Sequence, residues 1–90
     1  MQHPAVGRIV LYQFPDSEGG MLRPGIITHV WGDQPTSAVQ LQVFVDTDAQ
    51  GKYNDGRNQA INGPLVWKTS VSRGFGASQY HFHDDPDPLP

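Results

Sequence analysis

The chain has 90 residues, of which 10 are glycine and 8 are proline, and it contains no cysteine. This length allows one domain with a small core, and the lack of cysteine excludes disulfides and is typical of a reducing compartment. The formal net charge of −3 argues against non-specific binding to nucleic acid, and no apolar run reaches the ~18 residues that cross a membrane.

The first and third strand candidates show the alternation of a pleated sheet. Residues 7–14 (GRIVLYQF) alternate and end at Pro15. Residues 38–46 (AVQLQVFVD) place two glutamines and Phe44 on one face, which suggests that this face meets water. Phe44 is then either exposed or covered by a loop. The opposite face, expected to be buried, comprises Val39, Leu41, Val43 and Val45.

The second strand candidate, residues 23–31 (RPGIITHVW), carries both a large aromatic ring and an imidazole. Strict alternation places Ile27, His29 and Trp31 on one face of this strand. We therefore expect Trp31 to pack into the core and His29 to line the rim of the same face.

A long polar segment precedes the fourth strand candidate. Residues 46–63 (DTDAQGKYNDGRNQAING) hold several turn signals and predict one long loop, a kind of segment that is often functional or disordered. Residues 64–74 (PLVWKTSVSRG) predict the fourth strand. Its expected common face comprises Leu65, Trp67, Thr69 and Val71.

The chain closes with a short strand and a proline-rich end. Residues 78–85 predict the fifth strand, whose aromatic side chains alternate with histidines. Residues 84–90 (DDPDPLP) predict an extended tail, because proline cannot donate a hydrogen bond inside a sheet. The alternating side chains are Tyr80, His81, Phe82 and His83.

No segment shows helical periodicity, and several short strands separated by glycine and proline indicate an all-β protein. We expect a small five-stranded SH3-like barrel with one long loop and an extended C-terminal tail. An OB-like barrel is the second choice. The predicted domain is a single barrel over residues 1–83, followed by a Pro/Asp-rich tail over residues 84–90.

The end of the chain also holds candidate metal ligands. His81 and His83 point to the same side of a strand, so with Asp84 they could hold zinc, nickel or iron, with His29 as a further ligand. The simpler interpretation, which we prefer, is that both histidines face solvent while the neighbouring aromatic rings pack inward. No nucleophile motif or phosphate-binding glycine loop is present, so we expect neither catalysis nor a cofactor.

Aromatic and basic residues together suggest a binding surface. An aromatic ring can stack on a nucleobase while arginine holds its phosphate, or the same rings can dock a protein. The alternative is that the tryptophans are core residues or contacts within a homo-oligomer. The candidate ligand-binding residues are Trp67, Tyr80, His81, His29, Arg23 and Arg73.

Several short motifs, in this order, resemble a family of small uncharacterised tailed-phage proteins. These motifs are RPGIITHVW, VQLQVFVD, TSV and an ending of aromatic, histidine and aromatic, and the likeness covers roughly residues 6–83. The family has Trp-His-Trp-Pro where this chain has Tyr80 to His83, and asparagine where it has Gln40. The resemblance implies a phage-encoded accessory protein and assigns no activity.

From these observations we expect a phage-encoded, non-catalytic binding module that acts in the host cytoplasm and has an anti-defence role. Its partner would be a host protein or a small nucleotide signal, with no contact to membranes, and the module is a candidate homo-oligomer. The alternative is a virion accessory protein, such as a capsid decoration or tail component, that grips its neighbours with residues 1–5 and 84–90. A metal-dependent enzyme using His81 and His83 is the second alternative.

Overall fold

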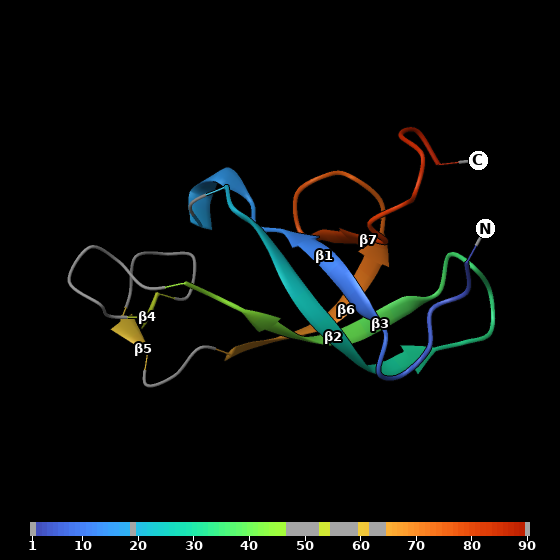
Figure 1. Ribbon diagram of the computed structural model, residues 1–90, viewed down its shortest axis with the longest axis horizontal. Coiled ribbons are helices and arrows are strands. Elements are labelled where there is room, and N and C mark those ends of the chain that lie inside the picture. Colours follow the sequence, from blue (N-terminus) through green and yellow to red (C-terminus); the bar gives the residue numbers. More distant parts are fainter. Residues whose placement is uncertain (1, 19, 47–52, 55–59, 62–64, 90) are drawn as a thin grey trace.

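The computed structural model describes residues 2–18, 20–46, 53–54, 60–61 and 65–89 of the 90-residue chain. Five strands of this part close into a barrel in the order β1-β2-β3-β6-β7 (Figure 1). The predicted all-β class and small five-stranded SH3-like barrel are therefore confirmed. In chain order, the elements are β1 (Ile9–Gln13), the 3-10 helix η1 (Asp16–Glu18), β2 (Leu22–Trp31), β3 (Ala38–Phe44), β4 (Tyr53–Asn54), β5 (Ala60–Ile61), β6 (Leu65–Arg73) and β7 (Gln79–His81).

The barrel strands pair antiparallel over most of the circumference. β1 pairs with β2, β2 with β3 and β3 with β6, and β7 returns to pair antiparallel with β1. β6 and β7 run parallel and meet over a short stretch at Ser72 and Arg73. This closure pairs the first strand with the last and removes sheet edges that would otherwise invite aggregation.

The segment predicted as one long loop contains a small sheet of its own. β4 pairs antiparallel with β5, and Figure 1 shows this pair beyond the ends of β3 and β6. Of the predicted loop, residues 47–52, 55–59 and 62–63 lie outside the described residues. Among the residues that the structure describes, no helix is long and apolar enough to cross a membrane.

Alternate side chains of the strands fill the barrel interior, as the sequence pattern predicts. On β3 the predicted inner face is buried, whereas Phe44 on the other face is exposed. Four aromatic rings share the interior with the aliphatic side chains and pack edge to face in pairs. The core comprises Val10, Tyr12, Phe14, Ile27, Val39, Leu41, Val43, Val45, Val71, Tyr80 and Phe82.

A β-bulge in β2 turns Trp31 out of the barrel. The pairing with β3 shifts register between Ile27 and His29, so one extra residue interrupts the alternation. Ile27 is buried, but the side chains of His29 and Trp31 are exposed. The prediction that Trp31 packs into the core is therefore wrong, because a one-residue shift moves every later side chain to the opposite face.

A second bulge divides β6 in the same way. The pairing with β3 shifts between Lys68 and Val71, next to Ser70, whose φ of 54° lies in the left-handed region. Trp67 and Thr69 are exposed before this bulge, whereas Val71 is buried after it. The prediction of one common face for this strand is therefore wrong, for the same physical reason.

The two faces of β3 give a direct test of the fold. Replacing Leu41 by Ala leaves a cavity at a fully buried site, so we expect the free energy of unfolding to fall by about 2–5 kcal/mol. Gln42→Ala, on the outer side of the same strand, is the matched control and should change it by less than about 0.5 kcal/mol. Urea denaturation followed by circular dichroism measures both, and equal losses would contradict the assignment of the faces.

Candidate functional site

The outward side chains of the barrel strands form a wall without formal charge at neutral pH. Soluble domains are designed with about 25–35% charged residues on their surface, so a strand surface without any charged residue is unusual. In chain order its residues are Ile9, Leu11, Gln13, Leu22, Pro24, Ile26, Thr28, His29, Trp31, Ala38, Gln40, Gln42, Phe44, Leu65, Trp67, Thr69, Ser70, Ser72, Gln79 and His81.

The three charged residues of the barrel strands occupy inward positions. Lys68 is half-buried, and its ammonium group lies 5.3 Å from the centre of the buried Phe14 ring. Arg23 lies between the outward residues Leu22 and Pro24, and its Nε atom is buried. Arg73 is buried as well. The wall is therefore uncharged because the strands turn their cations inward.

One part of this wall, on β2, β3 and β6, carries both tryptophans of the chain, and we call it the tryptophan face. Trp31 is 52% exposed and Trp67 is 54% exposed. Cross-strand pairing makes the face continuous, since His29 lies opposite Gln40, Gln42 opposite Trp67 and Phe44 opposite Leu65. The face comprises His29, Trp31, Gln40, Gln42, Phe44, Leu65 and Trp67.

Local contacts hold the two indole rings in place. Trp67 donates a hydrogen bond from its Nε1 to the Oε1 atom of Gln40, at 3.1 Å. The ring of Trp31 lies edge to face with the imidazole of His29, with 4.2 Å between the ring centres. Because the rings are ordered in advance, a partner that contacts them loses less side-chain entropy on binding.

The predicted ligand-binding residues do not gather in one place. His29 and Trp67 lie on the tryptophan face, on either side of Gln40. His81 lies on the outer side of β7, and Arg23 points inward from β2. Arg73 and Tyr80 are buried.

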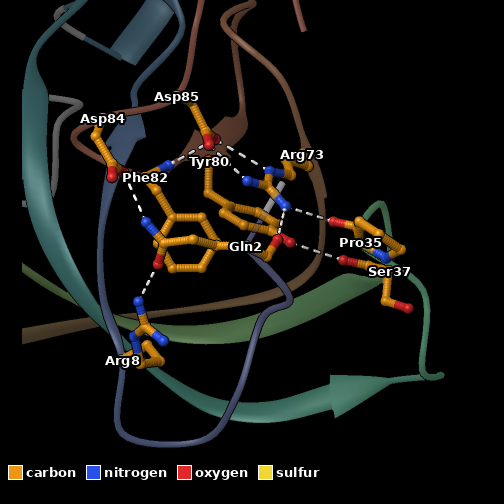
Figure 2. A network of polar contacts seen from close by, with 9 residues as sticks. All are labelled: Gln2, Arg8, Pro35, Ser37, Arg73, Tyr80, Phe82, Asp84 and Asp85. Atoms are coloured by element: carbon orange, nitrogen blue, oxygen red, sulfur yellow. Dashed lines mark hydrogen bonds and ion pairs between the residues drawn. The ribbon is translucent and has the colours of Figure 1, made fainter. Parts of the chain in front are cut away.

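Arg73 lies inside a polar network that joins both ends of the chain to the barrel (Figure 2). Its Nε donates to Oδ2 of Asp85 at 3.0 Å, and its Nη2 forms an ion pair with Oδ1 of the same carboxylate at 2.5 Å. Its Nη1 donates to the carbonyl oxygens of Gln2 and Pro35. The guanidinium is thus occupied by internal partners, and Asp85, predicted to belong to a tail, packs with the barrel.

Tyr80 belongs to the same network and is fully buried. Its hydroxyl donates a hydrogen bond to the carbonyl oxygen of Ser37, in the β2–β3 loop, at 2.8 Å. Burial raises the pKa of Tyr80 to about 12, so the hydroxyl stays protonated and remains a donor. In the free protein the ring of Tyr80 packs in the core and its hydroxyl is bonded to Ser37, so neither is available to a ligand.

The candidate metal ligands near the C-terminus are spread over different surroundings. The His81 ring stacks on Phe75, with 4.3 Å between the ring centres, and burial lowers the pKa of His81 despite the nearby Asp85 charge. His83 is exposed, and Asp84 accepts a hydrogen bond from Gln2. Among the described residues, no group of three or more His, Asp or Glu side chains is arranged to hold a metal ion.

Sequence reasoning missed two of the seven residues of the tryptophan face. Trp31 was expected inside, and Leu65 was expected to share a face with the buried Val71. The useful signal was the pair of glutamines on the third strand, which identified the outer side correctly. Neither bulge contains a glycine that would have marked it.

Comparisons with known proteins found no relative of this chain. No protein-family model matches the chain, and neither a curated protein nor a solved structure matches it. The candidate site therefore follows from the side chains themselves.

Because Asp85 forms an ion pair with the buried Arg73, we expect Asp85→Asn to lower the stability of the protein strongly. This change leaves the buried guanidinium of Arg73 without a countercharge, so we expect the free energy of unfolding to fall by about 3–5 kcal/mol at pH 7. Asp33→Asn, at an exposed carboxylate in the β2–β3 loop, is the matched control and should change it by less than about 0.5 kcal/mol.

The same pair predicts how this loss depends on pH. Burial alone would raise the pKa of Asp85, but hydrogen bonds from Arg73 and Phe82 and the Arg73 charge hold it below its usual value. The stabilisation is then complete above the unfolded-state pKa of about 3.9 and disappears as pH falls through the folded-state value. Urea denaturation between pH 7 and pH 3 measures the free energy of unfolding of the wild type and of Asp85→Asn. The difference between the two values should become smaller below about pH 4. A difference in unfolding free energy that stays constant with pH would contradict a stabilising ion pair between Arg73 and Asp85.

Proposed function

We propose that this protein is a non-catalytic binding module that docks a protein through its tryptophan face. The observation that carries the proposal is that Trp31 and Trp67 are each about half exposed on a continuous, uncharged part of the barrel wall. Consistent with the tailed-phage resemblance, we propose that the partner is a protein of the infected host cell.

The chemistry of the face suits a protein interface. Tryptophan supplies a large contact area with few torsions to fix, and it is enriched among the residues that dominate binding energy. Phe44 and Leu65 extend the apolar area beside Trp67. Contiguous exposed apolar surface of this kind is typical of interaction sites.

The lack of charge favours a protein over a nucleotide signal as the ligand. A nucleotide brings phosphate groups, which are usually held by arginine, lysine or backbone amides. The tryptophan face offers none of the charged groups, and Arg73 is already paired with Asp85. The amides of Gln40 and Gln42 both donate and accept hydrogen bonds, which suits the polar groups of a protein surface.

The ends of the chain also favour a module over a virion accessory protein that grips its neighbours with extended arms. Gln2 contacts Arg73 and Asp84, and Pro4 is buried. Asp85 is held by Arg73. Gln2, Pro4 and Asp85 are thus held against the barrel, which argues against terminal arms that are free over their whole length. An anti-defence role would then consist of occupying a host protein and needs no catalysis.

Single substitutions of the tryptophans test the proposal. Trp31→Ala and Trp67→Ala should each weaken capture of a specific host protein by at least ~30-fold, because an interface hot spot contributes about 2 kcal/mol or more. Both should leave the fold intact, since neither ring is in the core. The measurement is quantitative affinity capture from host lysate, followed by titration with the purified captured protein.

Thr69→Ala, at an exposed position on β6, is the matched control and should bind like the wild type. Folded tryptophan variants that bind the captured protein as tightly as the wild type would contradict the proposed face. Release of a tightly bound nucleotide from the purified protein on heating would contradict the proposed ligand class.

A further inference from the structure

A diagonal row of side chains joins the two tryptophans across three strands of the barrel. Trp31 packs edge to face with His29 on β2, and His29 lies opposite Gln40 on β3. Gln40 in turn accepts the hydrogen bond from the indole of Trp67 on β6. A partner that contacts both indoles therefore passes over two polar side chains between them.

The register of the sheet sets the distance between the two tryptophans. Trp31 lies opposite Ala38 and Trp67 lies opposite Gln42, so the two are separated by four residues along β3 and by two strand spacings. At ~3.4 Å per residue and ~4.8 Å between strands, these steps amount to roughly 16 Å. An extended peptide covers this distance in about four to six residues.

The tryptophan face is small for a contact between two folded domains. A standard protein–protein interface takes about 20–30 residues from each side, whereas the face comprises seven. One short stretch of polypeptide can cover a row of this length, with both of its ends continuing beyond the face. The size of the face therefore favours a single segment of the partner over a folded surface.

We propose that the tryptophan face binds one extended segment of the partner protein, an inference that rests on the proposed docking function. The segment carries two large apolar side chains about four to six positions apart, one for each indole. The residues between them are uncharged, because the face has no charged group to pair with a charge that loses its water.

The two glutamines of the face account for the extended conformation of the segment. The hydrogen bond from Trp67 uses Oε1 of Gln40 and leaves the Nε2 group of this amide able to donate to a partner. Gln42, the next outward residue of β3, offers both a donor and an acceptor. The main-chain N–H and C=O groups of an extended segment match these amides, whereas a helix satisfies its main-chain groups internally.

A displayed library of random peptides of about 12 residues, long enough to extend beyond both indoles, tests the inference when it is selected on the immobilised full chain. We expect the enriched peptides to share two large apolar residues about four to six positions apart. Trp31→Ala and Trp67→Ala should each weaken binding of these peptides at least ~30-fold, because each indole is an anchor. Thr69→Ala is the matched control and should bind like the wild type.

Two further substitutions locate the segment on the face. Replacing one apolar residue of an enriched peptide by Ala should weaken binding to the wild type at least ~10-fold but add little to the loss in one of the two tryptophan variants, as expected for groups in direct contact. Gln42→Ala should weaken binding about 5-fold, because a hydrogen bond to the main chain of the peptide is lost. Circular dichroism verifies that each variant is folded.

The outcomes separate this inference from the proposed function. Failure to enrich peptides, or enriched peptides that bind the folded tryptophan variants as tightly as the wild type, would overturn the extended segment. If the captured host protein still requires both tryptophans, the docking function then stands without it. A captured host protein that tolerates both substitutions contradicts the docking function itself.

Discussion

The interior of a five-stranded barrel has room for few large side chains, and this limit determines which of them lie on the surface of the protein. Tyr12 and Phe14 pack edge to face with 5.0 Å between ring centres, and Tyr80 and Phe82 pack similarly at 6.3 Å. Close-packed interiors leave few voids larger than a water molecule. With four rings and the aliphatic side chains inside, both indoles lie on the outer wall, where they define the tryptophan face.

The same interior also contains a charged side chain, that of Arg73. A buried guanidinium is costly unless its charge and its hydrogen-bond donors are matched, and Arg73 meets both needs through Asp85 and two backbone carbonyls. Those partners come from the N-terminal segment, the β2–β3 loop and the C-terminal segment. One buried side chain therefore fixes both ends of the chain, while the outer wall remains free of charge.

The fold was largely predictable because period-two alternation is a local property of the chain. Strand β3 shows this best, since its buried and exposed faces follow directly from its residues. The bulges near Thr28 and Ser70 were not predictable, because they depend on how two strands align, and no glycine marks them. The partners of Arg73 were also hidden, since Asp85 and Pro35 become its neighbours only when the barrel closes.

Both tryptophans lie on the surface of the free protein, and tryptophan fluorescence measures this exposure directly. The chain contains two tryptophans, so no core tryptophan contributes to the signal. With both indoles exposed, we expect red-shifted emission from the native protein and acrylamide quenching close to that of the urea-unfolded chain. Blue-shifted native emission that acrylamide quenches far less than it quenches the unfolded chain would show that the indoles are buried.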